Sequence, residues 1–162
     1  MIVADIMTPH AHQCSVNDTL DRAARLMWEH DCGAIPVVDL RGHTVGMITD
    51  RDICMAAYIQ GQPLHRIGVK VAGSRHVHSV APDASVELAC AIMRTHRVRR
   101  LPVIDIGGNL VGMLSLADIV RHTRRDGADG LDVEQIAAAV AEIYRPSLPA
   151  RREGNQAPST FS

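Results

Sequence analysis

The sequence is built from one pattern that occurs twice, 66 residues apart. Residues 3–53 align with residues 69–119 without a gap, and identical or chemically similar residues meet along the whole length. The pattern is clearest from Gly46 to Ile53, where an apolar strand end leads into a Thr-x-x-Asp step, and it returns from Gly112 to Ile119 with serine replacing threonine. An ungapped similarity over about fifty residues does not arise by chance. The chain is therefore a tandem duplication.

Each unit predicts the order strand, helix, strand, strand, helix. In the first unit, Asn17-Asp18 is a favourable helix start and precedes an apolar stripe at helical spacing. Pro36 lies near the start of the second strand, which favours an edge or entry position. The strands are expected at 11–16, 34–39 and 44–48, and the second helix from Thr49 to about Gln60.

The duplication also predicts how the units assemble. A unit of roughly sixty residues buries too little of its own surface, so two matching apolar faces should pack about a pseudo-twofold axis, with clefts between them. We therefore predict an α+β fold with one repeat at 1–62 and a second at 63–125. A linker and C-terminal helix follow at 126–144, with the helix from 131 packing on the module or on a partner chain. Residues 145–162 carry prolines and many polar residues, which predicts a disordered tail.

Composition excludes several classes of function. The net charge is −1 and aromatic residues make up 2%, which argues against nucleic acid as a partner. The start of the chain lacks a basic segment with a long apolar run, and no stretch is long enough to span a membrane. The four cysteines include no C-x-x-C pair, so we expect a reduced, cytoplasmic protein. No motif activates a nucleophile, and we expect no enzyme.

The duplicated pattern resembles the tandem CBS-domain pair, also called a Bateman module. The resemblance covers about 1–124 and rests on 35–39 with 46–53, on 101–105 with 112–119, and on the opening segment 5–8. It implies a regulatory module that requires no cofactor for chemistry and binds an adenosyl ligand such as AMP, ADP, ATP or S-adenosylmethionine. Such a module signals to a partner protein and commonly forms a homodimer, here through the first helix of each repeat and the terminal helix.

The resemblance also implies which residues bind the ligand. Asp52 and Asp118 would hold the ribose hydroxyls, while Thr49 and Ser115 would meet the phosphate at a helix start. Basic residues at the entry to the second strand would reach the phosphate, which implicates Arg99 and Arg100. The base pocket would comprise Met7, Cys32, Gly33, Ala34, Met47, Gly73, Val98 and Met113. Gly73 stands where the first unit has Met7, so one cleft wall should be wider.

The two clefts are expected to differ. If the repeats share residues across the interface, Thr49 and Asp52 face 98–100, whereas Ser115 and Asp118 face 32–34. The first cleft should then prefer phosphorylated ligands, and the second, less cationic one should take a nucleoside or stay empty. Two alternatives remain open from the residues alone. The Thr/Ser-x-x-Asp steps also suit capping boxes, and the arginines also suit a solvated basic edge.

Two further functions stay open. The first is a scaffold or dimerisation protein whose clefts bind nothing. The second is a metal-binding stress protein, because the paired steps His10-Ala11-His12 and His76-Val77-His78 would each point to one face of a strand, with Cys14 nearby. The alternative for these histidines is ordinary polar surface. We expect no metal, with His10, His12, His76 and His78 as the ligands if one is bound.

Overall fold

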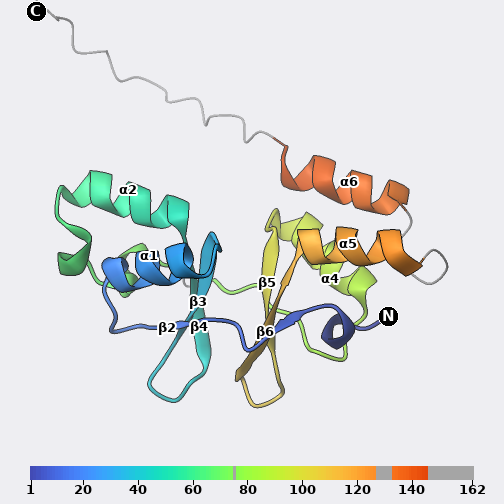
Figure 1. The fold of residues 1–162 in the computed structure, drawn as a ribbon, viewed down its shortest axis with the longest axis horizontal. Coiled ribbons are helices and arrows are strands. Elements are labelled where there is room, and N and C mark those ends of the chain that lie inside the picture. The colour runs from blue at the N-terminus through green and yellow to red at the C-terminus, as the bar shows by residue number, and fades with distance from the viewer. Residues whose placement is uncertain (75, 127–132, 146–162) are drawn as a thin grey trace, which may run out of the picture.

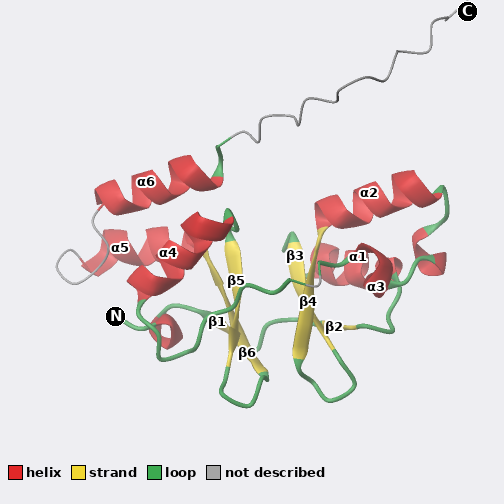
Figure 2. Ribbon diagram, turned by 180° about the vertical axis from the view of Figure 1, so that it is seen from behind, coloured by secondary structure: helices red, strands yellow, loops and turns green. Residues whose placement is uncertain are grey.

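The computed structural model describes residues 1–74, 76–126 and 133–145, and shows two three-stranded sheets side by side, each flanked by its own helices (Figure 1, Figure 2). The described elements of residues 1–72 are η1 (Val3–Asp5), β1 (Thr8–Pro9), β2 (Cys14–Ser15), α1 (Leu20–Glu29), β3 (Ala34–Val38), β4 (Thr44–Thr49), α2 (Asp50–Gln60), η2 (Leu64–Arg66) and α3 (Val69–Ala72). Those of the remaining described residues are α4 (Val86–His96), β5 (Arg100–Ile104), β6 (Leu110–Ser115), α5 (Leu116–Asp126) and α6 (Val133–Ile143).

The two repeats share one β-hairpin, β3-β4 in the first and β5-β6 in the second, although the third strand joins a different side of each hairpin. The structure confirms the predicted α+β fold of two repeats. One sheet has the order β2-β3-β4 and the other β1-β6-β5. The hairpins share their register, because Ala34 pairs with Thr49 in the first and Arg100 with Ser115 in the second, and both shift near the outer end. This pairing places the end of β4, and the end of β6, next to the start of the preceding strand.

Three local expectations differ from the structure. The first strand is only Cys14–Ser15, and α1 begins at Leu20 rather than directly after Asn17-Asp18, because the Asp18 carboxylate accepts a bond from the Ser15 amide and closes a turn. Strand β3 is central rather than at an edge. Pro36 is tolerated there because Met47, opposite it, directs its amide away to Ser74, so the proline occupies a position with no ladder bond to lose.

The opening segment of each repeat packs on the other repeat. Strand β1 pairs with β6 across the interface, with Thr8 opposite Met113. Val3 and Ile6 belong to the core of the second repeat, whereas Ile67 and Val69 belong to the core of the first. The two repeats therefore exchange their opening segments, which ties them into one unit.

This exchange explains why a glycine recurs in the duplicated pattern. A Cβ built on Gly112 would lie 2.8 Å from the carbonyl oxygen of Thr8, and one built on Gly46 would lie 2.8 Å from that of Ser74. In each case the crossing backbone leaves no room for a side chain. Gly46 and Gly112 are thus required by close backbone approach rather than by an unusual backbone angle.

The C-terminal helix α6 packs on the second repeat, against α4 (Figure 1). Its Ile136, Ala139 and Ile143 are buried in the core of that repeat. The expectation that this helix packs on the module is confirmed for 133–143. The expected linker after Asp126 and the expected tail from 146 lie outside the described residues. Among the described residues, no helix combines the length and the apolar character that crossing a membrane requires.

Candidate functional site

Both helix starts form complete capping boxes. The Thr49 amide and hydroxyl donate to Oδ2 of Asp52 at 2.9 and 2.7 Å, and the Asp52 amide donates back to the Thr49 hydroxyl at 3.2 Å. Ser115 and Asp118 repeat this with distances of 2.8, 2.6 and 3.2 Å. The capping interpretation is therefore realised in both repeats, and it engages only one oxygen of each carboxylate.

The second oxygen distinguishes the two carboxylates. The guanidinium of Arg121, one turn further along α5, donates to Oδ1 of Asp118. Within the described part of the chain, Oδ1 of Asp52 has no hydrogen bond or ion pair. Asp52 is half-buried and Asp118 is 7% exposed. Asp52 thus keeps a free acceptor at the start of a helix, whereas Asp118 is fully engaged.

The first cleft, of about 390 Å³, lies between the start of α2 and the segment that joins α4 to β5. Thr49 and Asp52 line one wall, and residues 97–100 line the other. Four arginines and two aspartates contribute to the lining, so the cleft carries an excess of positive charge. The structure thereby brings together the Thr-x-x-Asp step of one repeat and the arginines of the other. The full lining is Ala34, Met47, Thr49, Asp50, Arg51, Asp52, Ser74, His76, His78, Arg97, Val98, Arg99 and Arg100.

The second cleft, of about 280 Å³, is smaller and electrically more balanced. Ser115 and Asp118 face Cys32 and Ala34 in it, while two arginines and two aspartates contribute to its lining. Arg100 lines this cleft as well as the first, which the sequence did not indicate. The lining comprises Thr8, Ala11, His12, His30, Asp31, Cys32, Ala34, Arg100, Met113, Ser115, Asp118 and Arg121.

Three of the predicted base-pocket residues lie outside the linings of both clefts. Met7 packs its sulfur against Gly112, and Gly73 lines a separate apolar pocket of about 220 Å³ on the first repeat. Gly33 lies under the Asp50 carboxylate, since a Cβ there would approach Oδ2 to 2.9 Å. The remaining predicted residues divide between the clefts, with Met47 and Val98 in the first, Cys32 and Met113 in the second, and Ala34 in both.

Sequence reasoning missed several charged residues of the clefts. Asp50, Arg51 and Arg97 line the first, and Asp31 and Arg121 line the second. Arg121 carries the clearest signal, because it follows Asp118 by three residues and so shares a helix face with it.

The C-terminal helix contacts two arginines of the first cleft. The Arg97 guanidinium donates to Oε1 of Glu142 at 2.9 Å, in an exposed ion pair. The Arg99 guanidinium lies 5.6 Å from the centre of the Tyr144 ring, within the range of a cation–π contact. Helix α6 and the residue that follows it therefore help to position Arg97 and Arg99.

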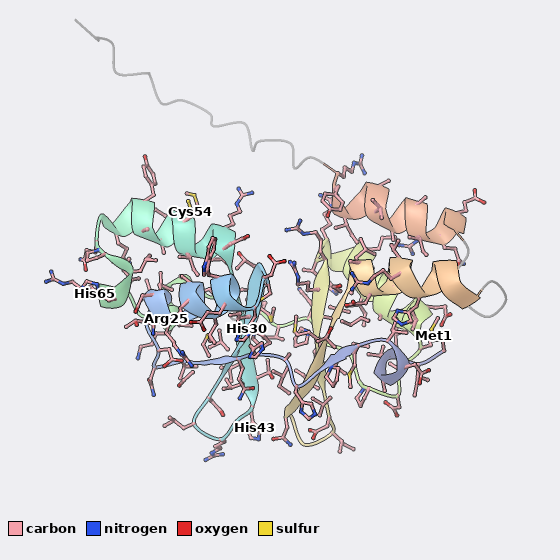
Figure 3. All side chains as sticks on the ribbon, in the orientation of Figure 1. Met1, Arg25, His30, His43, Cys54 and His65 are labelled. Atoms are coloured by element: carbon pink, nitrogen blue, oxygen red, sulfur yellow. The ribbon has the colours of Figure 1, made fainter. Side chains whose placement is uncertain are left out.

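The histidines pair between elements rather than along a strand. The rings of His12 and His30 stack with centroids 3.3 Å apart, and those of His78 and His96 stack at 3.7 Å. These pairs are themselves related by the 66-residue repeat, and Figure 3 shows His30 on the side of the first repeat that faces the second. Burial, with smaller contributions from His96 and His76, lowers the pKa of His78, which favours its neutral imidazole. Over the described residues, no three metal-ligating side chains gather into one group.

All four cysteines are free thiols in the structure. Burial raises the pKa of Cys14 to about 11 and raises the pKa of Cys90, so both are unreactive. Cys54 lies on the outer surface of α2 (Figure 3).

The comparisons with known proteins agree with this architecture. The sequence model of the CBS domain matches residues 3–58 and again 70–125. This chain belongs to the CBS domain family. It carries two copies, which form a tandem CBS pair. It is similar to the CBS domain-containing protein YhcV of Bacillus subtilis strain 168, with 41% identity over 135 residues, which cover 83% of this chain and 94% of the relative.

Two solved CBS-pair structures bear on the clefts. Hypoxic Response Protein I with two coordinated zinc ions is 34% identical, with a TM-score of 0.69, and the match covers 75% of this chain and 98% of that one. CBSX2 in complex with AMP is 27% identical, with a TM-score of 0.67, over 76% of this chain and 96% of that one. CBS pairs of this fold therefore include one solved with zinc and one solved with an adenosyl ligand.

Proposed function

We propose that this CBS pair is a regulatory module that binds an adenine nucleotide in the first cleft and signals to a partner protein. The observation that carries the proposal is the free Oδ1 of Asp52, which lies at a helix start opposite the arginines of the other repeat. The complex of CBSX2 with AMP supports the choice of ligand class.

The cleft offers a suitable partner for each part of the ligand. Ribose hydroxyls are donors, and the free carboxylate oxygen of Asp52 is an acceptor. The positive end of the α2 dipole and the guanidinium groups of Arg99 and Arg100 suit a phosphate. Met47 and Val98 supply apolar surface for the base.

A thermal-shift series with isothermal titration tests this function. AMP, ADP, ATP and S-adenosylmethionine are added at millimolar concentration, and at least one is expected to raise the melting temperature, because binding to the native state stabilises it. AMP is expected to bind more tightly than adenosine, since only AMP engages the arginines. No response to any of the four would overturn the proposal and favour a scaffold.

Arg99→Ala is expected to weaken AMP about three- to tenfold and to leave adenosine unchanged, because a partly exposed charge-assisted bond to phosphate is lost. Titration calorimetry at low and at high salt measures both ligands. Arg25→Ala is the control, because Arg25 is an exposed arginine on α1 that pairs with Asp21, away from both clefts. An equal loss for AMP and adenosine would contradict the assignment of Arg99 to phosphate.

We also propose a homodimer formed through the helices of the first repeat. Trp28 on α1 is 89% exposed, and Tyr58 and Ile59 on α2 are 82% and 73% exposed. Large exposed apolar side chains on both α1 and α2 are typical of an interface. Helix α4, which is the counterpart of α1 in the second repeat, packs against α6 of the same chain. Light scattering after gel filtration should give twice the chain mass of 17.6 kDa, and Trp28→Asp should give the monomer. A monomeric wild-type protein would contradict this proposal.

A second candidate function is zinc binding, which the two stacked histidine pairs favour. Each pair offers two nitrogen ligands, fewer than the four of a structural zinc site, so the described residues fit a site only in part. The repetition of the pair in both repeats parallels the two zinc ions coordinated in Hypoxic Response Protein I.

Elemental analysis of tag-free protein dialysed against zinc tests this candidate. Up to two zinc ions per chain are expected, and His30→Ala and His96→Ala should each remove one. His65→Ala is the control, because His65 lies in η2, away from His30 (Figure 3), and belongs to neither stacked pair. Zinc content that is zero, or unchanged in both variants, would rule out these histidines as ligands.

A further inference from the structure

Both clefts contain a capping box, but within the described residues only the box of the first cleft has an aspartate oxygen that is free of partners. In the first repeat Oδ1 of Asp52 is open, and in the second Oδ1 of Asp118 accepts from Arg121. Asp118 is also the one buried charged side chain among the described residues. A ligand entering the second cleft therefore meets a carboxylate that is already paired and desolvated.

The repeat alignment identifies the residue that accounts for the paired oxygen of Asp118. Arg121 corresponds, 66 positions earlier, to Met55, which lies three residues after Asp52 on α2. Methionine cannot donate a hydrogen bond, so the carboxylate of Asp52 stays free. Arg121 places a guanidinium at the same helical position, which suits an (i, i+3) pair with Asp118.

We propose that Arg121 occupies the ribose-binding position of the second cleft, so that the chain takes one adenosyl ligand, in the first cleft. This inference rests on the proposed function, because it assumes that a ribose binds through the aspartate. A ligand in the second cleft must displace a charge-assisted bond, and we expect its affinity there to be at least about tenfold weaker.

The surrounding charges support this assignment. Asp31 and Asp118 balance Arg100 and Arg121 in the second cleft, so no excess positive charge there attracts a phosphate in compensation. The first cleft combines a free carboxylate oxygen with excess positive charge. Both differences favour the same cleft.

Exchange of Met55 and Arg121 tests the inference. Equilibrium dialysis with radiolabelled AMP should give one AMP per chain for the wild type, two for Arg121→Met, and none at the same concentration for Met55→Arg. The double variant should return to one, and that binding should now be lost on Asp118→Ala instead of Asp52→Ala. Both positions are exposed on helices, and Arg121→Gln serves as a second variant if Arg121→Met lowers the melting temperature.

The outcomes separate this inference from the function on which it rests. Two AMP per chain in the wild type, or a single AMP in both Arg121 variants, overturns the inference and leaves nucleotide binding intact. Loss of AMP in Arg121→Met also overturns it, because Arg121 would then act as a phosphate ligand. No AMP on any of the proteins overturns the proposed function itself.

Discussion

Asp52→Ala is expected to lose at least tenfold in affinity for AMP, the largest effect of any single change in the clefts. The substitution removes the acceptor that we assign to the ribose hydroxyls, and a hydrogen bond to a charged group contributes about 1.5–3 kcal/mol. Titration calorimetry of AMP and of adenosine should show the loss for both ligands, since both carry the ribose.

The repeat supplies a matched control for this variant. Asp52 also completes a capping box, so its removal should destabilise the fold by about 1 kcal/mol. Asp118→Ala removes the same box from the second repeat together with the bond to Arg121, so it should lower stability at least as much, without the loss of affinity. Equal losses of AMP binding in the two variants would refute the difference between the clefts.

Gly112→Ala is expected to lower the free energy of unfolding by about 1–3 kcal/mol, because a new methyl group would be forced against packed backbone. The added Cβ would lie 2.8 Å from the Thr8 carbonyl oxygen, which cannot move aside as a flexible side chain can. Urea unfolding followed by circular dichroism measures the change. Gly46→Ala should behave alike, because Ser74 crosses it in the same way.

Gly68→Ala is the control for both glycine variants. Its backbone angles are those of an ordinary extended residue, with φ −76°, and the nearest atom to an added Cβ is Lys70 Cγ at 3.9 Å. Alanine there should leave stability unchanged or raise it by about 0.4–1 kcal/mol. Wild-type stability in both Gly46→Ala and Gly112→Ala would mean that the opening segments do not cross β4 and β6 as described.

The sequence predicted well those elements whose boundaries depend on residues close together in the chain. The start of α2 at Thr49 and its end near Gln60 both follow from residues within one helix length. Of the two positions expected from Pro36, an edge or an entry position, the edge is wrong for β3, because the neighbour that makes β3 central, β2, is two residues long and distant in sequence. A proline indicates only that its own backbone nitrogen donates no hydrogen bond, and it does not show how many strands flank the strand that carries it.

The candidate site was partly within reach of the sequence. Thr49, Asp52, Ser115 and Asp118 were identified as helix-start residues, and the structure places each beside a cleft. Their roles toward a ligand stay predictions. Arg121 was not identified from the sequence, because its bond to Asp118 depends on the side-chain rotamer that forms in the folded protein.

The sequence by itself determined that this protein is a duplication of one strand and helix pattern, because identity at a fixed offset needs no coordinates. It also offered both capping boxes as an alternative, and the structure confirms them, because they form between residues three apart. Only the tertiary structure decided that the opening segments are exchanged, that Arg100 lines both clefts, and that one carboxylate oxygen is free while its counterpart is paired. These features depend on contacts between residues that the chain brings together only when both repeats have folded.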